Sequence, residues 1–572
     1  MNTKAFDNQP QLWGHPVGLY VLFFTELWER FSYYGMRALL VLFIYTSIDD
    51  GGLGWTKGEA LELYGWYTMF VYVMSIPGGI LADKVLGQKK TVMLGGLLLC
   101  LGHGILAIHG ITAFYTGLGL IILGVGCLKP NISTMVGGLY QQGDERRDKG
   151  FIIFYIGINI GAFLSAIIVG YVGEKIGWHY GFGLAGIGMV LGQAVYIWGQ
   201  KYLVGVGDFI GTSGNENKEL MNKPLTKIEK DRVIVLLVSF LIIIVFWGAF
   251  EQAGGLLNIY AKEKTDLILP LIGYEIPASW FQSVNAFFII VFGTTVAAYW
   301  VNRKRKGKEV SSLFKMGVGT IIMGSGFLMM AGASIEAGGE AYGKASMFWL
   351  VAAYFLHTIG ELCSSPVALS FITKLAPVKY ASIMMGIYFA ATGFGNKLAG
   401  TIGEAAQAEP VKIEFIASPE QVKPFLTDSL VELDKDFILK ANIYEENGKV
   451  QLVNNQGDNK QDFSSFISMS SGAEKLLKEL LSSENGSKDN QLHAVLRLAK
   501  DIEAKKINAN NGDGKDYSGV IEIFEVQNER EYKIFLFITA LTVLFGLLII
   551  LFLKKLKILT HGAEDIELEA GH

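Results

Sequence analysis

Four ionisable side chains interrupt an apolar run near the start of the chain. The run extends from residue 17 to residue 45 and contains Glu26, Glu29, Arg30 and Arg37. An ionised side chain at bilayer depth costs roughly 2.5–3.5 kcal/mol on insertion scales, so these charges must face protein or a water-filled cavity. Two carboxylates beside two guanidinium groups can bind a proton and capture an anion.

The polar residues of this run share one side of a helix. At about 100° per residue, they fall within an arc of about 140°. The stripe consists of Glu26, Glu29, Arg30, Tyr33, Tyr34 and Arg37. The alternative is a structural ion pair that only holds helices together. We favour proton and anion binding, because ionisable residues inside membranes are usually functional.

A second intramembrane cation, Lys129, is followed directly by Pro130 in a later apolar span. Proline removes one helical hydrogen bond, so backbone carbonyls beside it can face the protein interior. The lysine needs a carboxylate or an aqueous cavity as its neighbour, unless it reaches toward the membrane interface. We favour a carboxylate or a cavity over the interface.

The composition is that of a membrane protein with many spans. The chain has 572 residues, of which 51% are hydrophobic and 18% charged, and its mean hydropathy is +0.36. The net charge of −4 implies no nucleic-acid partner. The three cysteines lie in apolar spans without metal-ligand spacing, so neither a disulfide framework nor a zinc site is indicated. We expect no cofactor other than protons as the coupling ion.

A window of about 20 residues predicts twelve membrane helices. Their approximate ranges are 17–45, 60–82, 91–109, 112–139, 151–172, 181–203, 233–260, 280–301, 313–333, 346–372, 380–403 and 533–553. Lys and Arg gather in alternate loops, for example near residues 84–90, 146–149 and 303–308. The positive-inside rule therefore predicts a multi-pass protein of the cell (inner) membrane with both termini cytoplasmic.

These spans divide the chain into two six-helix halves, as expected for alternating access around a central site. The expected parts are an N-terminal bundle (1–204), a cytoplasmic linker (205–232), helices 7 to 11 of the second bundle (233–406), an extracytoplasmic insertion (407–530), helix 12 (531–556) and a cytoplasmic tail (557–572).

The insertion reads as a small α+β module. Alternating apolar residues predict strands at 411–416 and 520–526, and helical spacing predicts amphipathic helices at 473–481 and 492–498. Asn485 begins a possible glycosylation triplet, although nothing else indicates a secretory pathway. The insertion could capture peptides or contact a partner, or it could be an excursion without a transport role.

The pattern Glu26-x-x-Glu29-Arg30-Phe-x-Tyr-Tyr-Gly-Met-Arg37 resembles the first-helix signature of the proton-coupled oligopeptide transporters. This family is the peptide-transporter branch of the major facilitator superfamily. Further segments resemble its motifs at 79–91, 124–133 and 151–163. The resemblance implies an all-α major facilitator fold with twelve helices in two bundles. It also implies that the protein imports di- and tripeptides together with protons. We expect the protein to be a monomer.

The resemblance also assigns roles to residues. It places Arg30, Lys129 and Asn159 at the peptide carboxylate and Glu361 at the peptide amino terminus. The other expected peptide-binding residues are Tyr33, Tyr34, Tyr67, Trp247, Asn285 and Tyr388. The residues expected to couple transport to protons are Glu26, Glu29, Arg30, Lys129 and Glu361. Arg37 and Glu251 are expected to form the outer gate. The cytoplasmic loop motif consists of Asp83, Lys84 and Gly87.

Cations in one half and a carboxylate in the other would match a zwitterion whatever its side chains are. A relative that moves nitrate or an amino acid conjugate is the alternative, followed by a membrane receptor that senses peptide. An enzyme is not indicated, because the sequence has no nucleophile–base constellation, and an ATP-driven pump would need a phosphate-binding loop that is absent.

Several positions depart from the family pattern. Gly65 stands where animal members carry a histidine, Tyr388 where relatives often carry tryptophan, and Phe250 where some bacterial relatives carry a second glutamate. The extra helix pair of many bacterial relatives is absent. Lys397 is a further intramembrane charge to which we assign no role, other than reaching toward the interface.

Overall fold

The computed structural model describes most of the chain. The described residues are 9–141, 144, 146–208, 225–338, 343–377, 381–407, 411–417, 437–446, 449–454, 461–462, 468–482, 491–499, 517–523 and 525–563. Much of the expected linker and the whole triplet that begins at Asn485 lie outside these residues. The chain separates into two compact units, Met1–Met330 with Met347–Ala405 and Leu536–His572, and Ala331–Ser346 with Ala406–Phe535.

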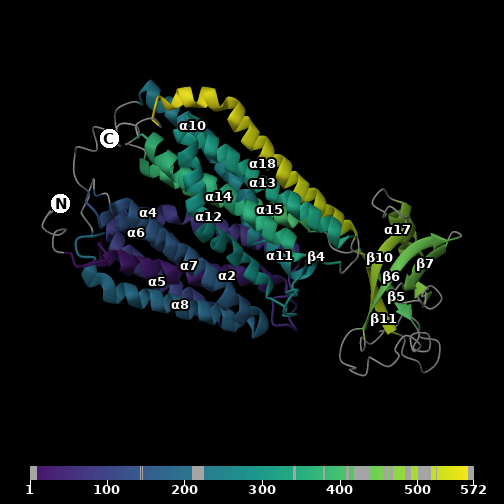
Figure 1. Ribbon diagram of the computed structural model, residues 1–572. Coiled ribbons are helices and arrows are strands. Elements are labelled where there is room, and N and C mark those ends of the chain that lie inside the picture. The colour runs from purple at the N-terminus through teal and green to yellow at the C-terminus, as the bar shows by residue number, and fades with distance from the viewer. Residues whose placement is uncertain are drawn as a thin grey trace. The chain divides into compact units, whose positions relative to one another are not determined.

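The first unit is built from long helices (Figure 1). Its N-terminal elements are β1 (Gln11–Leu12), β2 (His15–Pro16), α2 (Val17–Tyr45), α3 (Lys57–Val73), α4 (Ser75–Leu81), the π-helix η1 (Ala82–Leu86), α5 (Gln88–Leu106), α6 (Ile111–Gly138), α7 (Arg146–Lys175), α8 (Trp178–Gly199) and η2 (Gln200–Tyr202). Helix α2 packs against both α7 and α8, and α5 packs against α6 and α8.

The later elements form the second half of the bundle. They are α10 (Lys227–Phe250), η3 (Glu251–Ala253), α11 (Leu256–Lys264), β3 (Thr265–Asp266), η4 (Ala278–Trp280), α12 (Phe281–Arg305), α13 (Ser312–Ala337), β4 (Ala345–Ser346), α14 (Met347–Leu375), α15 (Ala381–Ala406) and α18 (Glu525–Thr560). Helices α12 and α7 pack together, which joins the two halves.

Ten helical segments of the described chain are long and apolar enough to cross a membrane. Helices α2 and α15 are 29 and 26 residues long but fall outside that set. Helix α2 carries the ionisable stripe, and α15 carries Asn396, Lys397 and Glu404 among its glycines. The predicted ranges agree with the helices to within a few residues at most ends, and crossing by α2 and α15 stays a prediction.

Local sequence signals mark several helix ends. Thr56 and Thr226 each start a helix with a capping box, in which the threonine hydroxyl accepts from the backbone N–H of Glu59 or Glu229. Gly87 ends the π-helix with a φ of 78°, a left-handed conformation that favours glycine. These signals fix where α3, α10 and α5 begin.

The second unit contains a seven-stranded sheet of order β8-β7-β6-β10-β11-β5-β9, with antiparallel pairings throughout its described register. Its elements are β5 (Val411–Ala417), β6 (Phe437–Glu446), β7 (Lys449–Asn454), β8 (Gln461–Asp462), β9 (Ser468–Met469), α17 (Ser471–Ser482), β10 (Gln491–Ala499) and β11 (Tyr517–Ile523). Helix α17 contacts β6 and β7.

Two predictions for the insertion are corrected by this sheet. The segment 492–498 is not a helix but the middle of β10, where Leu496 pairs with Leu439 of β6. Its leucines alternate with other residues, and so short a run fits both a strand and a helix period. The strand expected at 520–526 ends at Ile523, because α18 begins at Glu525. Strand β5 and helix α17 lie where they were predicted.

Helices α3 and α15 meet at two glycines. A Cβ atom placed on Gly400 would lie 2.6 Å from the Cα of Gly65, closer than real Cβ contacts allow. Small residues at such crossings let helix backbones approach, and the resulting van der Waals packing holds membrane helices together. The close approach therefore depends on both positions remaining glycine.

Substitution of Gly400 by alanine is expected to force the two helices apart and to lower the melting temperature of the purified protein. Overpacking of this kind costs about 1–3 kcal/mol. Gly104→Ala on α5 is the matched control, because no atom lies within 4 Å of a Cβ built there. Thermal unfolding in detergent compares the two variants. Equal melting temperatures would contradict the importance of the α3–α15 contact.

Candidate functional site

A cavity of about 1140 Å³ lies within the helical unit and is lined by residues from both halves of the bundle. Its lining includes the cations Arg30, Arg37 and Lys129 and the carboxylates Glu26, Glu251, Glu361 and Asp83. Tyr34, Asn159, Trp247, Asn285 and Tyr388 also line it, as the sequence predicted. This volume exceeds the usual 300–1,000 Å³ of small-molecule pockets, so a short peptide fits.

The polar stripe of α2 forms a buried cluster at one wall. The Nε atom of Arg30 lies 2.9 Å from Glu26 Oε1 and 2.5 Å from Glu29 Oε2. All three side chains are buried, and Arg30 and Glu26 reach the cavity while Glu29 lies behind them. One guanidinium is therefore shared between two carboxylates through its Nε atom, and an anion bound at its Nη atoms would weaken both pairs by drawing on the same positive charge.

Lys129 of α6 reaches the same wall. Its Nζ atom lies 3.8 Å from the centre of the Tyr72 ring, a cation–π contact. Lys129 lines the cavity and forms no ion pair with a carboxylate among the described residues, so of its two expected environments it has the cavity. Asn159 of α7 lines the cavity and donates to the backbone oxygen of Tyr155 on its own helix.

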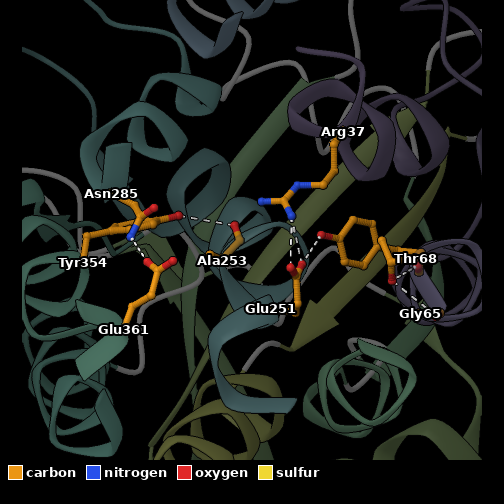
Figure 2. Close-up of polar contacts among 9 residues, drawn as sticks. Arg37, Gly65, Thr68, Glu251, Ala253, Asn285, Tyr354 and Glu361 are labelled. Atoms are coloured by element: carbon orange, nitrogen blue, oxygen red, sulfur yellow. Dashed lines mark hydrogen bonds and ion pairs between the residues drawn. The ribbon is translucent and has the colours of Figure 1, made fainter. Parts of the chain in front are cut away.

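The opposite wall carries Glu361 of α14. Asn285 of α12 donates from Nδ2 to Glu361 Oε2 at 2.9 Å (Figure 2). The same Nδ2 donates to the Thr358 hydroxyl oxygen at 3.0 Å. Trp247 and Tyr388 add aromatic surface on this side. The cavity thus places a carboxylate of the second half against cations of the first half.

Two tyrosines are not where they were predicted. Tyr33 and Tyr67 are buried and are absent from the cavity lining, whereas Tyr72 lines it. Tyr72 follows Tyr67 by five residues on α3, which turns it about 140° around the helix, so the two side chains cannot share one face. The sequence gives the angle between the two tyrosines around the helix, but it does not show which side of α3 faces the cavity.

An ion pair between the two halves lies in the wall of the cavity. Arg37 Nη1 donates to both oxygens of Glu251 at 3.1 Å, and the Tyr64 hydroxyl donates to Glu251 Oε2 at 3.0 Å (Figure 2). The predicted contact between Arg37 and Glu251 is confirmed, and its gate role stays a prediction. Sequence reasoning missed Tyr64, and it missed the nearby ion pair of Lys57 with Glu263.

Glu174 makes a further bridge between the halves. This buried carboxylate at the end of α7 accepts from the backbone N–H groups of Ala278 and Ser279, at 3.3 and 2.8 Å, and pairs with Lys262 at 3.1 Å. It thereby ties α7 to the start of η4, which leads into α12. The sequence showed only an acidic residue at a helix end, with no sign of its partners.

One residue of the loop motif, Asp83, lines the cavity, as does Gln88 at the start of α5. Within the part of the chain that the structure describes, Asp83 forms no ion pair with its neighbouring lysines, and Lys89 instead approaches Asp208 at 4.0 Å. The role of the loop motif of Asp83, Lys84 and Gly87 therefore stays a prediction.

Two of the unusual positions, Gly65 and Lys397, have local surroundings that bear on them. A side chain at Gly65 would meet Gly400 and the backbone oxygen of Lys397, at 3.0 and 3.3 Å from its Cβ, so a histidine there would require α15 to shift by a few tenths of an ångström. Lys397 lies 4.7 Å from the centre of the Trp66 ring and 4.0 Å from Glu62 of α3. It joins α15 to α3, which the sequence did not reveal.

A family model described as the POT family matches residues 89–206 and 210–417. The chain belongs to this family. Its members are transporters, which agrees with the prediction that the protein is not an enzyme. The match begins in α5 and ends with β5, so it covers the chain from α5 through α15 and the first strand of the insertion, but not α2 to α4.

The chain aligns with most of the length of each of three relatives. The chain is 38% identical to the "Uncharacterized transporter YclF" of Bacillus subtilis (strain 168), over 68% of this chain and 88% of that protein. It is 35% identical to a "Di-/tripeptide transporter" of Lactococcus lactis subsp. cremoris, over 66% and 87%. A crystal structure of a peptide transporter POT in complex with sulfate is similar, with a TM-score of 0.65, 34% identity and coverage of 71% and 92%.

The ion pair of Arg37 with Glu251 can be tested by exchanging the two charges. Breaking a buried pair by losing one partner costs about 3–5 kcal/mol, because the other charge stays buried and unpaired. Arg37→Glu and Glu251→Arg are each expected to lower the melting temperature, and the double exchange is expected to recover much of the loss. Tyr64→Phe should cost only about 0.5–1.5 kcal/mol. A double exchange as unstable as the sum of the single variants would argue against a direct pair.

Proposed function

We propose that this protein is a proton-coupled symporter that imports di- and tripeptides across the cell membrane by alternating access. The observation that supports this most is the cavity, with Arg30 and Lys129 on one wall and Glu361 on the other. A peptide of any sequence carries one carboxylate and one ammonium group at its ends. Charges of opposite sign on opposite walls can pair both ends without reading the side chains.

In this proposal the peptide carboxylate binds Arg30 and Lys129, with Asn159 beside them, and the ammonium group binds Glu361. Tyr34, Trp247 and Tyr388 surround the side chains. The similar Lactococcus lactis protein is named a di-/tripeptide transporter, which supports the same substrate class. Asn285 orients the Glu361 carboxylate through the 2.9 Å hydrogen bond.

Proton coupling would arise at Arg30. The guanidinium and a proton compete for the oxygens of Glu26 and Glu29. A peptide carboxylate that takes up Arg30 releases these oxygens, so peptide and proton favour each other's binding without touching. One pH unit with 100 mV is worth about 1.4 plus 2.3 kcal/mol per proton, or roughly 500-fold accumulation of a neutral peptide at one proton each.

We assign the structure to one state of the cycle. The contacts of Arg37, Glu174 and Lys57 join the two halves, and the cavity lining includes Asp83 of the loop motif. With that motif on the cytoplasmic side, as predicted, these contacts would close the outer end of an inward-open state with both termini cytoplasmic. We also propose that α2 and α15 complete a set of twelve membrane helices and that the protein acts as a monomer.

Uptake of a labelled dipeptide into proteoliposomes, with and without an imposed proton gradient, tests the function directly. Accumulation that needs the gradient and that peptides of varied side chain suppress is the expected result. Suppression by small anions but not by peptides would instead indicate a different substrate. The absence of any flux would favour a receptor.

Glutamine at Glu26 or Glu29 mimics a permanently protonated carboxylate. Gradient-driven uptake is expected to fall to the level seen without a gradient, while peptide exchange at equal pH survives for at least one of the two variants. Counterflow and uptake assays on the same proteoliposome preparations separate these activities. Wild-type accumulation by both variants would falsify the assignment and move the proton site to Glu361 or Glu251.

The insertion is proposed to be accessory to transport. Arg530 Nη1 donates to the backbone oxygen of Gln407 at 2.9 Å, so the two ends of the insertion meet. A short polar linker in place of about residues 410–528 can therefore join α15 to α18 without strain. We expect the deletion variant to keep most of its maximal uptake rate. A correctly inserted variant that loses most of this rate would show that the insertion takes part in the cycle.

A further inference from the structure

Gln282 of α12 faces the cavity and was not singled out by the sequence. It lines the cavity three residues before Asn285, so the two amides lie one helical turn apart on the same face. Its Nε2 atom is buried and has no hydrogen-bond partner among the described residues. A buried donor without a partner costs about 1–3 kcal/mol, so its place in a ligand cavity calls for an acceptor.

Three other amides of the lining, those of Asn131, Asn159 and Asn285, already donate to partners, and the fourth, Gln88, lies on α5. Asn285 Nδ2 is held by Glu361 and Thr358, and Asn159 Nδ2 is held by the backbone oxygen of Tyr155. The Tyr354 hydroxyl, also in the lining, donates to the backbone oxygen of Ala253 (Figure 2). An uncharged acceptor on a ligand that sits beside Glu361 therefore meets Gln282 as its available amide donor.

We propose that Gln282 donates a hydrogen bond to the first backbone carbonyl of the bound peptide. This inference rests on the proposed function. The first carbonyl is attached to the same carbon as the amino terminus, which Glu361 is proposed to bind. Asn285 holds Glu361, and Gln282 lies one turn away on α12, so ammonium and carbonyl can be bound by neighbouring turns of this helix.

This contact would distinguish a peptide from other zwitterions of equal length. Two charged walls alone accept any molecule whose ammonium and carboxylate are suitably spaced. A donor aimed at the carbonyl adds a preference for the amide itself, because a ligand without a carbonyl leaves the buried Nε2 unpaired. Gln282 is thus assigned to substrate specificity, not to proton coupling.

Three ligands with the same backbone length test the assignment. Glycylglycine has both the carbonyl and the N–H of the amide. 5-Aminolevulinic acid keeps the carbonyl but replaces the N–H by a methylene group, and 5-aminopentanoic acid has neither. Their affinities for the purified protein are measured by competition against a labelled dipeptide, and the ratios within one variant do not depend on the amount of folded protein.

The wild type is expected to bind the two carbonyl ligands about five- to tenfold more tightly than 5-aminopentanoic acid, the effect of one hydrogen bond. In Gln282→Met, which keeps the side-chain length, all three ligands should bind equally, and Gln282→Leu provides a second apolar variant. Ser283→Ala is the control, because this neighbour lies outside the lining and donates to the Trp280 backbone oxygen. It should preserve the wild-type ratios.

Other outcomes overturn the assignment in different ways. A carbonyl preference that persists in both Gln282 variants, or an equal loss of affinity for all three ligands, would show that Gln282 has no contact with the carbonyl. If the wild type binds no labelled dipeptide, the proposed function fails and this inference falls with it. Wild-type dipeptide binding without any carbonyl preference overturns the inference alone.

Discussion

Charged side chains inside the bilayer must avoid lipid, and this constraint organises the helical unit. Arg30 is enclosed by Glu26 and Glu29, and Lys129 lies over the ring of Tyr72. Both cations face one cavity instead of the lipid. Because a charge left in hydrocarbon is so costly, the helices that carry these residues are held around a shared polar interior. The same constraint explains why Lys397, away from this cavity, lies between Glu62 and Trp66.

Helix α12 carries two kinds of contact that depend on each other. Its start is tied to α7 through the Glu174 carboxylate, and one to two turns later it presents Gln282 and Asn285 to the cavity. A shift of α7 against η4 would therefore be passed along α12 to these polar groups. Such a link suits the alternating access that we propose.

The helix ranges and much of the site could be predicted from the sequence, because both follow from local patterns. Apolar runs define the spans, and a charge within such a run has few acceptable environments, so the roles of Glu26 and Arg30 were open to inference. The contacts of Glu174 and Tyr64 join distant segments, and no local pattern reports them. Tyr67 was misplaced because the sequence gives the spacing around a helix but not the direction of its partners. The segment 492–498 was misread because a short apolar run does not distinguish a strand from a helix.

The position of the insertion has a consequence for biosynthesis. Helix α18 packs against α13, where the Thr539 hydroxyl donates to the Gly324 backbone oxygen and Gly546 lies against Gly317. More than a hundred residues of the insertion are translated between α15 and α18. At 5–20 residues per second, the ribosome needs roughly 6 to 25 s for that stretch. During this time the glycine-lined face of α13 has no final partner, so the bundle is completed only after the insertion has left the ribosome.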